Sequence, residues 1–150
     1  MAARQPEDAI ELLKADHRTV NDLFQQYEAT QDHTRKQHIA EQACTALHVH
    51  AQLEEDIFYP VFAEKADDEG KQLVEESLQE HLTVKDMIAE LQALQGEEFA
   101  LKFQELMEAV RDHVLEEETD MFPEAEQILA GDREDLLREM QALKRQLTNS

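Results

Sequence analysis

Hydrophobic residues recur every three or four positions through most of the chain, which is the spacing of helices that bury one face. Pro60 and Pro123 fall inside the second and fourth stretches of this kind. Each proline is expected to kink or break its helix, because it has no backbone N–H to donate. The four stretches are separated by short polar or glycine-containing turns and cover residues 6–30, 34–66, 71–94 and 97–130.

A fifth, shorter amphipathic stretch covers residues 132–147. Gly131 is expected to cap the fourth helix, and Asp132 is expected to be the N-cap of the fifth. Four long helices joined by short loops predict an up-down-up-down four-helix bundle. We therefore expect an all-α fold in a single domain, residues 1–150, with the bundle in residues 6–130 and an additional short C-terminal helix.

Composition supports helices and limits the partners. Aromatic residues make up only 5% of the chain, and glycine and proline occur three times each. Such a shortage of helix breakers favours mostly helix. The formal net charge of −21 argues against nucleic acid and anionic membranes as partners, because both bind through Lys and Arg.

Cys44 is the single cysteine, which excludes an intrachain disulfide, a zinc finger and an iron–sulfur cluster held by this chain's own thiolates. Residues 1–8 are polar and do not resemble a signal peptide. No run of eighteen apolar residues predicts a membrane span. We expect a cytoplasmic protein, with a homodimer as one option for its assembly.

A pattern of histidine and glutamate occurs twice along the chain. Each copy begins with one histidine and ends with a second histidine that a glutamate follows four residues later. Residues four apart share a helix face, so the second histidine and its glutamate can bind the same ion. The six candidate metal ligands are His17, His50 and Glu54 in the first copy, and His81, His113 and Glu117 in the second.

A single histidine on an apolar stripe is more often a hydrogen-bonded core residue than a ligand. Four imidazoles and two carboxylates converging in one bundle, however, would all need partners for their polar atoms. We therefore predict a metal site. Two glutamates shared by two ions, with two histidines on each, favour a non-haem di-iron centre with an oxo or hydroxo bridge. Neither the Glu-x-x-His of ferritin-like proteins nor the HExxH of zinc proteases occurs.

The other polar residues near these motifs are expected to face away from the metals, as surface groups or groups outside the ligands. They are His33, His38 and His48, and the carboxylates Asp16, Glu55, Glu80, Glu116 and Glu118. Tyr59 is expected to pack in the core, with a hydrogen bond to the site as the alternative. A dry cavity beside the metals is expected to be lined by Phe24, Ile57, Val61, Ile88 and Met121.

Together these motifs resemble the hemerythrin-like proteins of the HHE cation-binding type. The resemblance covers about residues 10–128 and includes the Phe-Pro pairs that follow each glutamate. It implies a four-helix bundle around a non-haem di-iron centre. Oxygen-carrying hemerythrins have a fifth histidine on the third helix, four residues from its partner, whereas Ser77 and Lys85 flank His81 at that spacing here. By resemblance, His17 and His50 would hold one iron, His81 and His113 the other, and Glu54 and Glu117 would bridge them.

The function expected from this reading is a di-iron protein that binds or reacts with O2, NO or H2O2. If it is an enzyme, it is a di-iron oxidoreductase. The alternative is an iron store or an iron/oxygen sensor without turnover, in which the C-terminal helix meets a partner. A structural bundle without metal is the third and weakest hypothesis.

Overall fold

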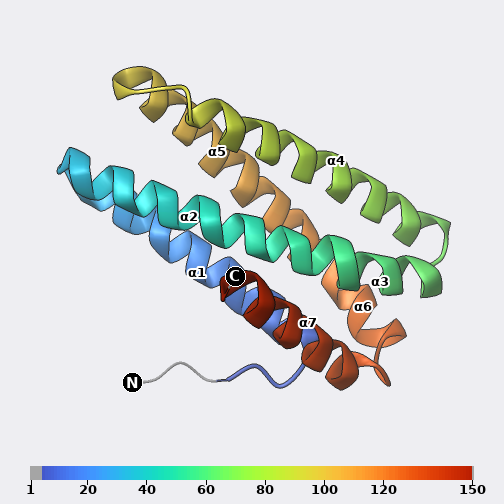
Figure 1. Cartoon of the computed structure of the whole chain (residues 1–150). Coiled ribbons are helices and arrows are strands. Elements are labelled where there is room, and N and C mark those ends of the chain that lie inside the picture. Colours follow the sequence, from blue (N-terminus) through green and yellow to red (C-terminus); the bar gives the residue numbers. More distant parts are fainter. Residues whose placement is uncertain (1–4, 150) are drawn as a thin grey trace.

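A computed structural model describes residues 5–149 and confirms the all-α prediction. Residues 1–4 of the polar N-terminal segment and Ser150 lie outside the described part. Two helical hairpins lie side by side, α1 with α2 and α4 with α5, and α7 packs along the first hairpin (Figure 1). The helices are α1 (Ala9–Ala29), α2 (His33–Leu53), α3 (Tyr59–Lys65), α4 (Asp68–Leu91), α5 (Gly96–Glu116), α6 (Phe122–Ile128) and α7 (Arg133–Thr148).

Aspartate side chains start three of these helices. Asp8 accepts a hydrogen bond from the backbone of Glu11, so α1 begins two residues beyond the expected proline turn. Asp32 and Asp67 cap α2 and α4 in the same way, by accepting from the exposed backbone N–H groups of the first turn. The predicted break around residues 67–70 is therefore a tight turn into α4.

The prolines of the second and fourth stretches do not end their helices. A five-residue π-helical segment precedes each proline: η1 (Glu54–Phe58) and η2 (Glu117–Met121). In a π-helix each N–H bonds to the carbonyl five residues earlier. This wider turn connects α2 to α3 and α5 to α6 without a break, although Pro60 and Pro123 have no N–H to donate.

The C-terminal helix packs on the first hairpin through buried Leu136 and Met140. An ion pair between Lys65 and Asp132 fixes its start. The prediction that Gly131 caps the fourth helix in a left-handed conformation is wrong, because only Gly96 has a positive φ (61°) among the described glycines. Asp132 does occupy the N-cap position of α7, but its side chain makes no capping hydrogen bond.

Two hydrophobic clusters make up the core, one toward each end of the bundle. The first joins the beginning of α1 to α3, α6 and α7, and the second joins the end of α1 to the beginning of α2 and α5. The six candidate ligands belong to neither cluster and lie between them along the helices. None of the helices described is both long and apolar enough to cross a membrane.

Candidate metal centre

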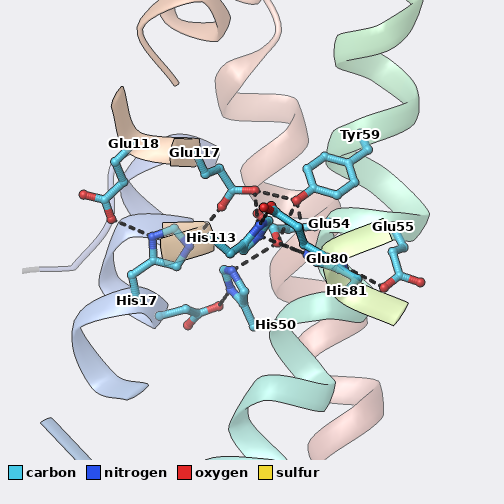
Figure 2. A network of polar contacts seen from close by, with 11 residues as sticks. His17, His50, Glu54, Glu55, Tyr59, Glu80, His81, His113, Glu117 and Glu118 are labelled. Atoms are coloured by element: carbon cyan, nitrogen blue, oxygen red, sulfur yellow. Dashed lines mark hydrogen bonds and ion pairs between the residues drawn. The ribbon is translucent and has the colours of Figure 1, made fainter. Parts of the chain in front are cut away.

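The structure brings all six predicted ligands together in the middle of the bundle (Figure 2). One histidine comes from each of α1, α2, α4 and α5, and the two glutamates are the first residues of η1 and η2. All six are at most 7% exposed, so the bundle shields the cluster from bulk solvent. The sequence pattern therefore predicted the convergence correctly, helix by helix.

The ligand atoms form two groups in which every atom lies within 4.8 Å of the others. The first group contains His17, His50, Glu54 and Glu117, and the second contains Glu54, His81 and His113. Glu54 belongs to both groups, because its Oε1 lies 3.3 Å from His50 Nε2 and 3.1 Å from His81 Nε2.

Glu117 lies between the two hairpins in the same manner. Its Oε1 is 3.0 Å from His17 Nε2, and its Oε2 is 3.5 Å from His113 Nε2. Each glutamate thus faces a histidine of its own hairpin and a histidine of the other. This is the placement that two metal ions bridged by carboxylates require.

Several of these buried atoms have no hydrogen-bond partner among the described residues. They are His17 Nε2, His50 Nε2, Glu54 Oε2 and Glu117 Oε1. Buried polar atoms are nearly always satisfied, so four such atoms in one cluster call for an explanation. A donor set of imidazole nitrogens and carboxylate oxygens without thiolate fits a first-row transition metal.

Each of the four imidazoles has a carboxylate on its outer nitrogen, which the sequence analysis did not predict. The Nδ1–O distances are 2.6 Å from His17 to Glu118, 3.0 Å from His50 to Asp16, 2.8 Å from His81 to Glu55 and 2.7 Å from His113 to Glu80. Such contacts fix the orientation of a ligand histidine and leave Nε2 for the metal.

These four carboxylates were expected to face away, and that prediction is wrong for a geometric reason. A residue next to a ligand points about 100° around its own helix. It therefore misses the histidine of its own helix but meets one on a neighbouring helix. Asp16 and Glu80 reach the second histidine of their own hairpin, whereas Glu55 and Glu118 reach across to the other hairpin. Glu116 is exposed, as predicted.

The signal for these contacts was present in the repeat. An acidic residue precedes the first histidine in both copies, and a second glutamate follows the candidate bridging glutamate in both. Two lysines extend the network further: Lys85 Nζ is 2.7 Å from Glu55 Oε1, and Lys144 Nζ is 2.7 Å from Asp16 Oδ1. Lys144 lies on α7, so the C-terminal helix is connected to His50 through Asp16.

The charges of the cluster are strongly coupled. Burial acts to lower the pKa of His50, but the Glu54 carboxylate and the hydrogen bond to Asp16 raise it to about 10. Burial opposes the shift of His113 in the same way, and Glu117 raises its pKa to about 10. The charge of His50 in turn holds the pKa of Glu54 well below its usual range, against the effect of burial. Metal uptake by such a cluster releases protons from the histidines.

Tyr59 also reaches the cluster, so the hydrogen-bonded alternative for this residue is correct. Its hydroxyl lies 3.2 Å from Glu54 Oε1, 2.5 Å from Glu117 Oε2 and 3.2 Å from His81 Nε2. The cause is η1, because a π-helical turn places residue i+5 on the face of residue i, whereas an α-helix turns it away. Burial and the neighbouring carboxylates raise the pKa of Tyr59 well above 10, so its neutral hydroxyl donates.

The second copy has a phenylalanine at the corresponding position. Phe122 stacks on His17 with the ring planes 7° apart and the centroids 5.7 Å apart. The two halves of the site therefore differ by one hydroxyl group, which lies beside His81 and has no counterpart beside His17.

A cavity of about 240 Å³ adjoins the four imidazoles on the side of the second hydrophobic cluster. Of the five residues expected to line it, only Ile88 does. Ile57, Val61 and Met121 pack instead in or against the first cluster, on the other side of the site. His33, His38 and His48 are exposed, as predicted, and His48 lies at the rim of this cavity.

Comparisons with known proteins agree with this geometry. Residues 8–125 match the family model described as the hemerythrin HHE cation-binding domain. An uncharacterized hemerythrin-like protein of Schizosaccharomyces pombe is 30% identical over 117 residues, which cover 77% of this chain and 58% of that protein. The chain thus spans little more than half of that relative's length. A crystal structure of a hemerythrin HHE cation-binding domain-containing protein from Mycobacterium kansasii has the same fold, with a TM-score of 0.80, 20% identity, and coverage of 95% of this chain and 88% of that one.

Proposed function

Since this chain belongs to the family of hemerythrin HHE cation-binding domains, we propose that its histidines and glutamates hold two iron ions in a non-haem centre. His17 and His50 bind one ion, His81 and His113 bind the other, and Glu54 and Glu117 bridge them. The observation that carries this proposal is the membership of Glu54 in both ligand groups, since a residue shared by two groups is what a bridged pair needs.

The charge and chemistry of the donors favour iron over other ions. Four imidazoles and two carboxylates suit iron in either of its common oxidation states, whereas a structural zinc site would close at four ligands and would not be duplicated. When bound, the pair supplies two one-electron redox equivalents and coordination positions for a small ligand. The four outer carboxylates orient the imidazoles and offset the positive charge of the ions.

The function that this centre supports best is binding or reduction of a small oxidant: O2, NO or a peroxide. The cavity beside the imidazoles supports this function, because it gives such a ligand a route to the cluster. Tyr59 is placed to donate a proton or a hydrogen bond within the centre, and the buried surroundings exclude bulk water.

An iron or oxygen sensor is the second candidate, and one contact favours it. Lys144 of α7 binds Asp16, which in turn binds His50. A change at the centre could therefore alter how α7 packs on the first hairpin. Iron-dependent partner binding without turnover would distinguish this function from the first.

Anaerobic reconstitution with ferrous ion, iron quantitation and stopped-flow mixing with O2, NO and H2O2 test the proposal. We expect two irons per chain and a ferric visible spectrum that changes on reduction and on addition of NO. The variant His50→Ala should lose iron, whereas His48→Ala, an exposed histidine on the same helix, should keep it. A protein that stays iron-free after reconstitution, or two variants that behave alike, would contradict it.

A further inference from the structure

The cavity beside the imidazoles has an inner end and an outer end. Its buried lining includes His17, His50, His81 and His113, so its inner end is the cluster itself. The exposed residues of its lining belong only to α2 and α4 and are His48, Ala89 and Gln92. The cavity therefore opens to solvent between α2 and α4, two helices of different hairpins that pack only weakly on each other.

The size of the cavity exceeds what a diatomic molecule needs. Its volume of about 240 Å³ is larger than that of a buried apolar cavity of roughly 150 Å³ that accepts benzene. A ligand the size of an aromatic ring or a branched alkyl group therefore fits. O2, NO and H2O2 would leave most of the apolar lining without contacts, and such contacts contribute much of the affinity of a small-molecule site.

The lining selects for an uncharged, apolar body. Between the imidazoles and the rim it consists mainly of aliphatic side chains, namely Val20, Leu47, Val84, Ile88, Val110 and Val114. No carboxylate is among the described residues that line it. The one amine, Lys85, already pairs with Glu55 at 2.7 Å, so it offers little to an anion. The net charge of −21 further disfavours anionic ligands.

We propose that the substrate class of this site is a neutral organic hydroperoxide, whose apolar body fills the cavity while its peroxide end reaches the imidazoles. This assignment rests on the proposed iron function and narrows it. In the overall step the O–O bond breaks with uptake of two electrons and two protons, and an alcohol and a water leave. The electrons come from the reduced metal pair, and an external one-electron reductant such as ascorbate restores them.

Binding of an unreactive product analogue tests the cavity without turnover. The probe is 2-phenyl-2-propanol, the alcohol formed from cumene hydroperoxide, and isothermal titration to the oxidised, iron-loaded protein measures it. We expect one molecule bound per chain. An analogue with a carboxylate on the ring should bind at least about tenfold more weakly, since the lining offers no unpaired cation.

Two matched variants locate the binding. Val84→Phe places a ring in the cavity one turn from His81 and should weaken alcohol binding at least about tenfold. Leu82→Phe adds a similar volume on the exposed side of the same helix, where the leucine is 52% exposed, and should leave binding unchanged. Absence of alcohol binding to the unaltered protein, or equal effects of the two substitutions, would overturn the cavity assignment.

Peroxide kinetics then test the substrate class separately from the iron function. For the unaltered protein, kcat/KM for cumene hydroperoxide should exceed that for H2O2 by at least about tenfold, and Val84→Phe should remove the difference. Equal or faster reaction with H2O2 overturns the substrate class but leaves the proposed function intact. If no peroxide reacts while O2 or NO does, the substrate class again fails; if none of the three reacts, the proposed function fails with it.

Discussion

The hydroxyl of Tyr59 offers the sharpest test of the cluster's electrostatics. Tyr59→Phe removes one oxygen atom from a residue that is 1% exposed and keeps the ring that packs beside Phe58 and His81. The lost contact is a buried hydrogen bond from a neutral phenol to the Glu117 carboxylate at 2.5 Å. Without it, the nearest described partner of Glu117 Oε2 is His113 Nε2 at 3.5 Å.

The expected cost follows from the type of bond. A hydrogen bond to a charged group contributes about 1.5–3 kcal/mol to stability, and more of that is lost when the acceptor stays buried. At about 2–4 °C per kcal/mol for a chain of this size, the melting temperature should fall by roughly 3–12 °C. The two hydrophobic clusters on either side of the site are expected to keep the bundle folded without metal, so the measurement is made on chelator-treated protein.

The chain contains a matched control. Tyr27 is also buried, at 7% exposure, but its hydroxyl makes no hydrogen bond within the described residues. Tyr27→Phe should therefore change the free energy of unfolding by less than about 0.5 kcal/mol in urea titrations. If the two substitutions cost the same, or if Tyr59→Phe costs nothing, the assigned hydrogen bond does not stabilise the cluster.

Three further predictions concern the outer contacts and the packing. Asp16→Asn should weaken iron binding roughly 10–100-fold in chelator competition, and Lys144→Met should weaken it less, because the lysine reaches the ligand only through Asp16; a larger loss for Lys144→Met would refute the order. Gly70→Ala should destabilise the fold by about 1–3 kcal/mol, because an added Cβ would lie 2.6 Å from the neighbouring alanine Cβ, while Gly131→Ala, which meets nothing within 4 Å, should not. Burial raises the pKa of Cys44 to about 11, so its thiolate form and its alkylation by iodoacetamide should rise about tenfold per pH unit between pH 8 and 10; rapid alkylation at pH 8 in the folded protein would contradict this.

The sequence predicted the helices and the six converging residues because both depend on regular periodicity. Amphipathic spacing identified each helix to within a few residues, and the four-residue step from His50 to Glu54 holds on an α-helix. The prediction failed where the helix departs from that geometry. Tyr59 joins the site only because η1 shifts the register by one residue, and proline alone does not indicate whether a helix will break or form a π-helical turn.

The outer carboxylates were missed for a different reason. Glu55 and Glu118 contact histidines on the other hairpin, and the angle at which two hairpins pack cannot be read from the pattern of either. The cavity depended on the same information. Its aliphatic lining comes from all four main helices, so only their arrangement in space shows which end of the site it adjoins.

The division of the site between the hairpins also bears on its ancestry. Each hairpin supplies two imidazoles, one shared carboxylate and the acidic groups that hold the partner's rings, so neither could bind a pair of cations alone, yet two copies of either could. A half-length ancestor is thus chemically sufficient as a symmetric dimer, and gene duplication followed by fusion would give the present chain. On that view the pair of Tyr59 and Phe122 marks the point where the copies diverged, and the two cation positions stopped being equivalent.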